Sequence, residues 1–141
     1  MHMIKLCVGV ATLEELESYR EERAHWWGAD YGEDVHVHRT RMMPKRAAEI
    51  EAQGSIYWVI SGVIRCRQPI RRLAKASDDE GRGCCDIIMA PDLVRTVPRP
   101  KRPFQGWRYL EPKNAPLDLN GEEAGSGSEI IAEELARLGL L

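Results

Sequence analysis

The sequence predicts a single α+β domain, built as a mostly antiparallel sheet or a small open barrel with two or three packed helices. Short apolar runs with a period of two recur along the chain, as is typical of half-buried strands. Helix-start signals separate the first of these runs from the longest one, at residues 54–70. The 141 residues are 43% hydrophobic, so one core can form without disulfides or metals.

The first strand and the first helix follow from the opening residues. Apolar residues alternate over residues 4–10 and predict a strand. Thr12 stands three residues before Glu15, a capping box, and predicts a helix over about residues 13–26, followed by a loop at 28–34. The stripe of this helix that we expect to cover the sheet consists of Leu13, Leu16, Arg20 and Arg23.

Residues 35–40 alternate valine with histidine and predict a short strand. His36 and His38 then share one face, which is an allowed geometry for two ligands of one metal ion. A metal site needs a third and usually a fourth ligand, and the neighbouring sequence supplies none. We therefore expect a surface or edge-strand histidine pair instead of a metal centre, and no cofactor.

Pro44 opens a second predicted helix, and we expect Gly54 to end it in a left-handed conformation. Lys45 and Arg46 oppose the dipole of its first turn, so they either serve an anion or form a solvated pair. The solvated pair is the expected arrangement.

Residues 54–70, GSIYWVISGVIRCRQPI, predict the central strand. Its expected core face consists of Ile56, Trp58, Ile60, Ile64, Cys66 and Ile70. Strict alternation places Arg65 and Arg67 together on the opposite side. Gly62 marks either a sharp bend in one strand or a turn between two strands in tight contact.

The polar residues 71–83 predict a long connection to a buried strand at 84–89, which would pair with residues 56–70 as an antiparallel hairpin. The four cysteines fit no CxxC spacing or disulfide framework, so we expect thiols in a reducing compartment. The opening residues lack a signal-peptide pattern and no apolar run is long enough to span a bilayer. We expect a cytoplasmic protein with no membrane partner.

A proline-rich basic arm follows at residues 90–110, where four prolines force extended backbone. Five cations alternate with three aromatic residues along it: Arg95, Arg99, Lys101, Arg102 and Arg108 with Phe104, Trp107 and Tyr109. Such a pattern suits a nucleic-acid strand, with cations on phosphates and rings stacked on bases. An arm that buries the same aromatics as core, with arginines reaching solvent, fits the pattern as well.

Charge is unevenly distributed along the chain. Residues 1–38 hold three Lys or Arg against eight Asp or Glu, residues 39–110 hold fifteen against seven, and residues 111–141 hold two against seven. A clustered positive field steers polyanions even on a slightly acidic protein, although acidic helices that neutralise basic strands explain the same numbers. Composition divides the chain into a domain at 1–119, a linker at 120–127 and a helix at 128–141.

Five segments, MIKLCVGV, TRMMPKRA, GSIYWVISGVIRCRQ, LVRTVPRPKRPFQGWRYL and ARLGLL, resemble a proteobacterial family known only as a domain of unknown function. The resemblance covers nearly the whole chain and implies no activity. A helix that ends in glycine and leads into a strand is also similar to PUA-like and ASCH-like domains, which bind RNA or modified nucleotides. The ASCH pattern has lysine and glutamate after that glycine, whereas this chain has Ser55 and Ile56.

Three functions follow from these residues. The first is a non-enzymatic nucleic-acid-binding domain, with RNA favoured, whose expected contacts are Tyr57, Arg65, Arg67, Arg95, Arg99, Lys101, Arg102, Trp107 and Arg108. The second is an enzyme or binding protein for a small anion, with Arg65, Arg67 and Arg95 as a clamp and His36 or His38 as general base. The third is a protein-interaction module whose acidic ends screen the basic centre. The sequence assigns no catalytic residue and leaves the oligomeric state open.

Overall fold

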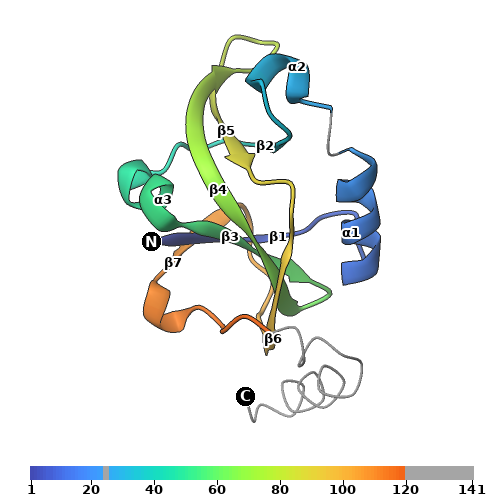
Figure 1. Ribbon diagram of the computed structural model, residues 1–141. Helices are drawn as coiled ribbons and strands as arrows, with labels where there is room; N and C mark the ends of the chain where they lie inside the picture. The colour runs from blue at the N-terminus through green and yellow to red at the C-terminus, as the bar shows by residue number, and fades with distance from the viewer. Residues whose placement is uncertain (24–25, 120–141) are drawn as a thin grey trace.

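A single mixed sheet organises the protein in the computed structural model, which describes residues 1–23 and 26–119 (Figure 1). Its seven strands are β1 (His2–Leu6), β2 (His36–Thr40), β3 (Ser55–Ile60), β4 (Val63–Ser77), β5 (Gly83–Met89), β6 (Val94–Pro100) and β7 (Trp107–Leu110). The strand order is β2-β5-β4-β3-β1-β7, with β6 paired to β4. The helices are α1 (Leu13–Glu22), α2 (Gly28–Tyr31), α3 (Ala47–Gln53) and the short 3-10 helix η1 (Pro112–Asn114). The α+β prediction is confirmed.

Only one strand pair, β1 with β3, is parallel; the other pairs in the described part of the chain are antiparallel. α1 and α3 both lie on one side of the sheet, since Leu16 of α1 and Ile50 of α3 belong to the main core cluster with Trp58 and Ile87. None of the helices in the described residues is long and apolar enough to cross a membrane.

β4 is the longest strand and joins the two halves of the sheet. Its first half pairs with β3 and β6, and its second half pairs with β5. Ser61 and Gly62 adopt φ values of 50° and 80°, which close a tight β3–β4 turn and confirm the reading of two strands in contact. The expected hairpin with the strand at 84–89 forms, but its partner is residues 70–77. The residues expected to be a long connection are therefore strand, and only 78–82 remain as the turn.

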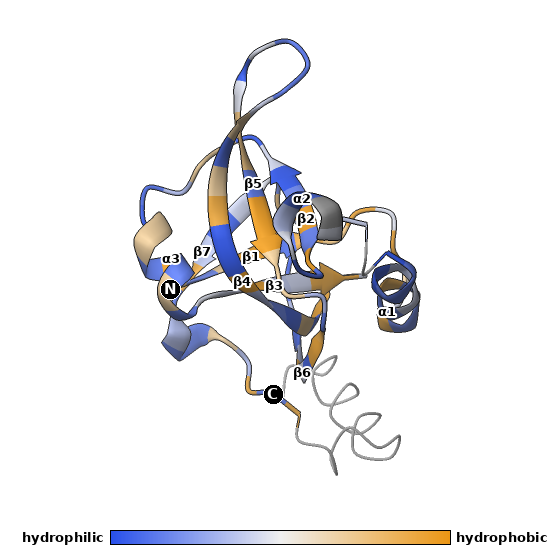
Figure 2. Ribbon diagram, turned by 45° about the horizontal axis from the view of Figure 1, so that its top comes forward, coloured by the Kyte–Doolittle hydropathy of each residue, from blue (hydrophilic) through white to orange (hydrophobic). Residues whose placement is uncertain are grey.

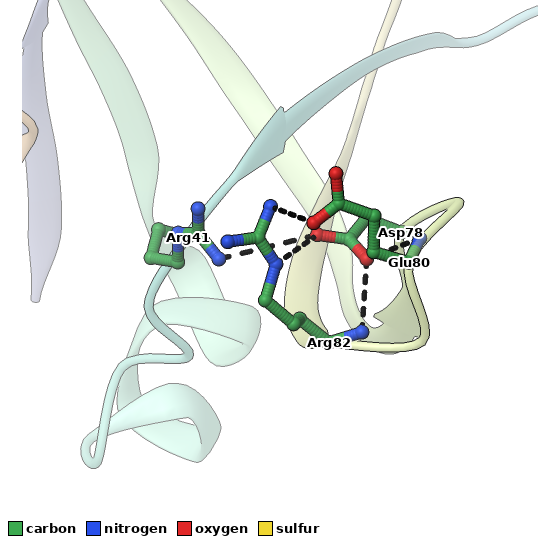
Figure 3. A network of polar contacts seen from close by, with 4 residues as sticks. All are labelled: Arg41, Asp78, Glu80 and Arg82. Carbon is green, nitrogen blue, oxygen red and sulfur yellow. Dashed lines mark hydrogen bonds and ion pairs between the residues drawn. The ribbon is translucent and has the colours of Figure 1, made fainter.

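Polar contacts organise this hairpin tip, which projects beyond the rest of the sheet as a hydrophilic loop (Figure 2). Asp78 Oδ1 accepts hydrogen bonds from the backbone N–H groups of Glu80 and Arg82, at 2.9 and 2.8 Å. Arg82 Nε donates to Asp78 Oδ2 at 3.1 Å, and Arg41 approaches the same carboxylate (Figure 3). These hydrogen bonds, led by that from the Arg82 backbone, lower the pKa of Asp78, and Arg82 Nη2 also pairs with Glu80 Oε2 at 2.9 Å.

A register shift divides the core into two clusters. Trp58 lies opposite Cys66, but Val59 lies opposite Ile64, so Arg65 is an extra residue on β4. Cys66 therefore faces the main cluster, whereas Ile64 joins a second cluster on the other side of the sheet, with Ile4, Tyr57, Val59 and Phe104. The prediction of one continuous apolar face was wrong at Ile64, and alternation no longer places Arg65 and Arg67 on one side.

Several boundaries differ from the sequence prediction. The first strand ends at Leu6, and Val8 is exposed because the chain has left the sheet. α1 ends at Glu22, and residues 28–31, expected as loop, form the single turn α2. α3 begins at Ala47, after two turn residues, and not at Pro44.

Gly54 is needed for space and not for a left-handed conformation, which corrects the prediction. Its φ of −82° and ψ of 159° are extended values that any residue adopts. A Cβ built there would stand 2.4 Å from the carbonyl oxygen of Met1 and 2.5 Å from that of Ile50. The end of α3 and the start of β1 therefore pack directly against this backbone.

Replacing Gly54 by alanine is expected to lower the free energy of unfolding by roughly 1–3 kcal/mol, the cost of overpacking. The clash is with backbone atoms, which no side-chain rotation relieves. Urea unfolding would measure the loss. Gly83→Ala is the matched control, since a Cβ at Gly83 meets nothing within 4 Å; equal unfolding midpoints for both variants would contradict the steric argument.

Candidate nucleic-acid interface

Cations of the arm gather on the side of the sheet that carries the second core cluster. Arg99 of β6 lies opposite Ile64 of β4, and Arg108 of β7 lies opposite Ile4 of β1. Directly opposed residues project from the same face of a sheet. We call this surface, formed by Arg67, Arg99, Lys101 and Arg108 around the second cluster, the basic face.

Phe104 lies beneath two of these cations. It is 7% exposed and belongs to the second cluster. Lys101 Nζ stands 6.0 Å and Arg108 Cζ 4.7 Å from its ring centroid, which are cation–π distances. Phe104 is therefore a core residue beneath two cations, as predicted by the alternative in which the arm buries its aromatic residues. Its ring is not open for stacking on a base.

A hollow of about 630 Å³ opens at one side of the basic face. Its polar lining includes Arg46, Arg99, Lys101, Tyr109, Glu111 and Asn114, over an apolar floor that includes Ile4 and Ile64. Arg99 Nη1 donates to the carbonyl oxygen of Asn114, and the Arg46 backbone N–H donates to Tyr109 Oη at 3.1 Å. Segments from positions 46, 99 and 109 thus meet at one concave cationic surface.

Two of the predicted arginines are held in internal ion pairs. Arg67 forms a two-pronged pair with Asp118, Nε to Oδ1 at 2.8 Å and Nη2 to Oδ2 at 2.9 Å, and its Nη1 donates to Ser55 Oγ. Arg95 Nη2 contacts Glu17 Oε1 at 2.7 Å, on the α1 side of the sheet. The pair with Arg67 lowers the pKa of Asp118 and raises that of Arg67, mainly through the hydrogen bonds.

The other predicted contacts are distributed more widely. Tyr57 is buried in the second cluster, and Trp107 packs against the main cluster while its Nε1–H donates to the carbonyl oxygen of Met42 at 3.0 Å. Arg102 is exposed just beyond β6, and Arg65 lies at the register shift. The structure therefore brings together Arg99, Lys101 and Arg108 but not the full predicted set.

The predicted histidine pair lies elsewhere. β2 is an edge strand, as expected, but His36 is only 2% exposed and the ring of His38 packs edge-on against Trp58, so the pair is not on the surface. In the described residues no group of three or more His, Cys, Asp or Glu side chains could hold a metal ion.

Arg46 lines the hollow but was not among the residues predicted to contact nucleic acid. The only sequence feature that pointed to a role for Arg46 in anion binding was its position in the first turn of a predicted helix, where a cation opposes the helix dipole. In the structure Arg46 Nη2 donates to Glu49 Oε1 at 2.8 Å, which offsets that position, and the side chain still lines the hollow.

These features define a small α+β protein with one mixed sheet and a cationic face in its described part. Residues 3–141 match the family described as protein of unknown function DUF1489, and the chain belongs to that family. The resemblance to a family known only as a domain of unknown function is thereby confirmed. No curated protein and no solved structure matches the chain.

The Arg67–Asp118 pair predicts a pH-dependent contribution to stability. The folded-state pKa of Asp118 lies below its usual value, so the pair stabilises above that value and the stabilisation is lost as pH falls through the folded pKa. The Asp118 side chain is 44% exposed, so Asp118→Asn is expected to lower the free energy of unfolding by at most about 1 kcal/mol at neutral pH, and by less near pH 2.

Urea unfolding of both proteins at the two pH values measures this difference. The exposed Asp79 supplies the control, because Asp79→Asn removes a carboxylate from the hairpin tip instead. A stability difference for Asp118→Asn that does not change with pH would contradict the assignment.

Proposed function

We propose that this protein is a non-enzymatic nucleic-acid-binding domain, with RNA favoured, and that the basic face contacts the phosphate backbone. The observation that carries the proposal is the convergence of Arg46, Arg99 and Lys101 around one hollow, with Arg108 beside it. Cations gathered in this way attract a polyanion because each phosphate contact releases condensed counterions. A flexible single strand follows a small concave surface more readily than a duplex does.

Recognition through this face would be of phosphates more than of bases. Phe104 and Tyr57 are buried and Trp107 is engaged by Met42, which leaves Tyr109, 37% exposed at the hollow, as the exposed aromatic residue of the arm. Phosphate contacts position a nucleic acid but carry no sequence information. We therefore expect binding that depends strongly on salt and weakly on sequence.

The two alternatives receive less support. An anion clamp of Arg65, Arg67 and Arg95 would need converging side chains, but Arg67 is paired with Asp118 and Arg95 with Glu17 on different sides of the sheet. The interaction module depends on residues 120–141, which lie outside the described residues, and stays a prediction.

Fluorescence anisotropy with labelled oligouridine tests the proposal. Affinity is expected to fall steeply with salt, and Arg99→Gln combined with Lys101→Gln should reduce the slope of log K against log salt by about 0.7 for each lost phosphate contact. Arg41→Gln, whose guanidinium approaches Asp78 at the hairpin tip and does not line the hollow, should leave the slope unchanged. Labelled oligodeoxyuridine compares RNA with DNA.

Absence of binding at low salt would overturn this proposal. Equal slopes for the double variant and for the protein without substitutions would overturn the assignment to the basic face.

A further inference from the structure

A second hollow, which we call the histidine cavity, lies on the other side of the sheet from the basic face. It has a volume of about 450 Å³, within the range of small-molecule sites. α1, the end of β1 and β2 surround it, and its polar lining consists of Lys5, Tyr19, Arg20, Arg23, His36 and His38. Lys5 neighbours Ile4 on β1 and projects from the opposite face, so the two surfaces are separate.

The charge on this lining is all positive. Lys5, Arg20 and Arg23 are the three basic residues of the acidic segment 1–38, and all three line the cavity. None of the eight Asp and Glu residues of that segment lines it. The three cations of an otherwise acidic segment therefore converge on this cavity, and its positive charge favours an anionic ligand.

Three buried nitrogen atoms at this cavity have no hydrogen-bond partner among the described residues. They are Arg20 Nε, His36 Nε2 and His38 Nε2. Four buried side-chain atoms in the described part of the chain are left without a partner, and only Thr96 Oγ1 is not at this cavity. A buried polar atom without a partner costs free energy, so a ligand that bonds to these nitrogens would recover it.

Arg20 is a largely buried cation whose guanidinium has no carboxylate partner in the described residues. Burial lowers its pKa, and the neighbours that act on it are Cys7, Tyr19, Cys66 and Arg23. Glu17, the acid one turn earlier on α1, is engaged by Arg95 at 2.7 Å. Arg20 Cζ stands 5.6 Å from the ring centroid of Trp58, which partly compensates for desolvation of the charge.

The two histidines are uncharged at neutral pH. Burial, and then the charges of Lys5 and Arg20, lower the pKa of His38 to about 4. Burial and the charge of Arg20 lower the pKa of His36, against the effect of a hydrogen bond to the Arg20 backbone. A neutral imidazole offers one N–H donor and one acceptor nitrogen. The cavity thus supplies both kinds of hydrogen bond beside its cations.

Aromatic rings form the walls. Trp58 lies at the base, with the His38 ring edge-on at 5.5 Å. Tyr19 and Trp26 stand partly exposed at the rim, and Arg23 Cζ lies 3.8 and 4.1 Å from their ring centroids. Rings and a stacked guanidinium provide flat surfaces that favour a flat ligand.

We propose that the histidine cavity binds a small organic anion that carries a flat ring. Arg20 and Lys5 receive its anionic group, and His36 and His38 hydrogen-bond to the polar atoms of its ring. A mononucleotide and an aromatic carboxylate share this chemistry. The site is independent of nucleic-acid binding by the basic face.

Titration monitored by tryptophan fluorescence tests the proposal, because Trp26, Trp27 and Trp58 all line the cavity. The probes are uridine and adenosine monophosphates and benzoate, with inorganic phosphate as the anion without a ring and adenosine as the ring without an anion. At least one ring-bearing anion should bind saturably and at least about tenfold more tightly than both controls, the value of one charge-assisted hydrogen bond. The relative affinities of the monophosphates and benzoate show whether the ligand is a mononucleotide or an aromatic carboxylate.

Arg20→Gln should weaken that binding at least about tenfold, and Arg102→Gln, exposed beyond β6, should leave it unchanged. Lys5→Gln serves as a second variant, and circular dichroism checks that each variant is folded. The proposal is overturned if no ring-bearing anion binds saturably, or if both cavity variants bind as tightly as the protein without substitutions. Oligouridine binding should be unaffected by Arg20→Gln, so the two proposals fail separately.

Discussion

The register shift between Trp58 and Val59 determines which side chains of β4 face each side of the sheet. One extra residue, Arg65, turns Cys66 toward the helices and leaves Ile64 and Arg67 on the other side. Cys66 thereby joins Trp58, which floors the histidine cavity, in the main cluster, and Arg67 lies with Ile64 on the side of the basic face. Without the bulge, continued alternation after the turn would leave Ile64 in place but exchange the sides of Cys66 and Arg67.

The two faces hold their cations in different ways. On the basic face, charge lies over apolar core or is shared with carboxylates, as in the pair of Arg67 with Asp118, and most of it remains in contact with solvent. In the histidine cavity, Arg20 Nε is shielded from solvent without a hydrogen-bond partner. An exposed ion pair contributes little and can be exchanged for a mobile polyanion at low cost. A desolvated cation discriminates more strongly, since only a well-placed anion compensates for its burial.

Much of the fold could be predicted from periodicity and turn chemistry. The capping box is present, with Thr12 Oγ1 accepting from the Glu15 N–H at 3.2 Å. The turn at Gly62 joins two strands, which was one of the two predicted arrangements. The bulge could not be predicted, because Ile64 and Cys66 are both apolar and fit either register. The two sites were harder to predict than the fold. Ion pairs such as that of Arg67 with Asp118 join residues far apart in the sequence, and no local sequence pattern indicates them.

Arg20 is instructive because its signal was visible. It falls on the helical stripe that Leu13 and Leu16 bury, and an arginine on a core-facing stripe needs a reason to be there. The sequence placed the residue correctly, but it could not show that His36, from a strand beyond a second helix, faces the same space. Convergence of side chains from separate elements is a property of topology, whereas sequence patterns describe one element at a time.

The position of β1 between β3 and β7 has a consequence for how the chain assembles. Its two neighbours begin at Ser55 and Trp107, so each of its pairings closes a long loop. The hairpins of β3, β4 and β5 close through short turns and pay little loop entropy. Among the described strands β7 pairs only with β1, so the burial of Met3 and Ile4 at the centre of the sheet depends on two pairings between segments far apart in the sequence.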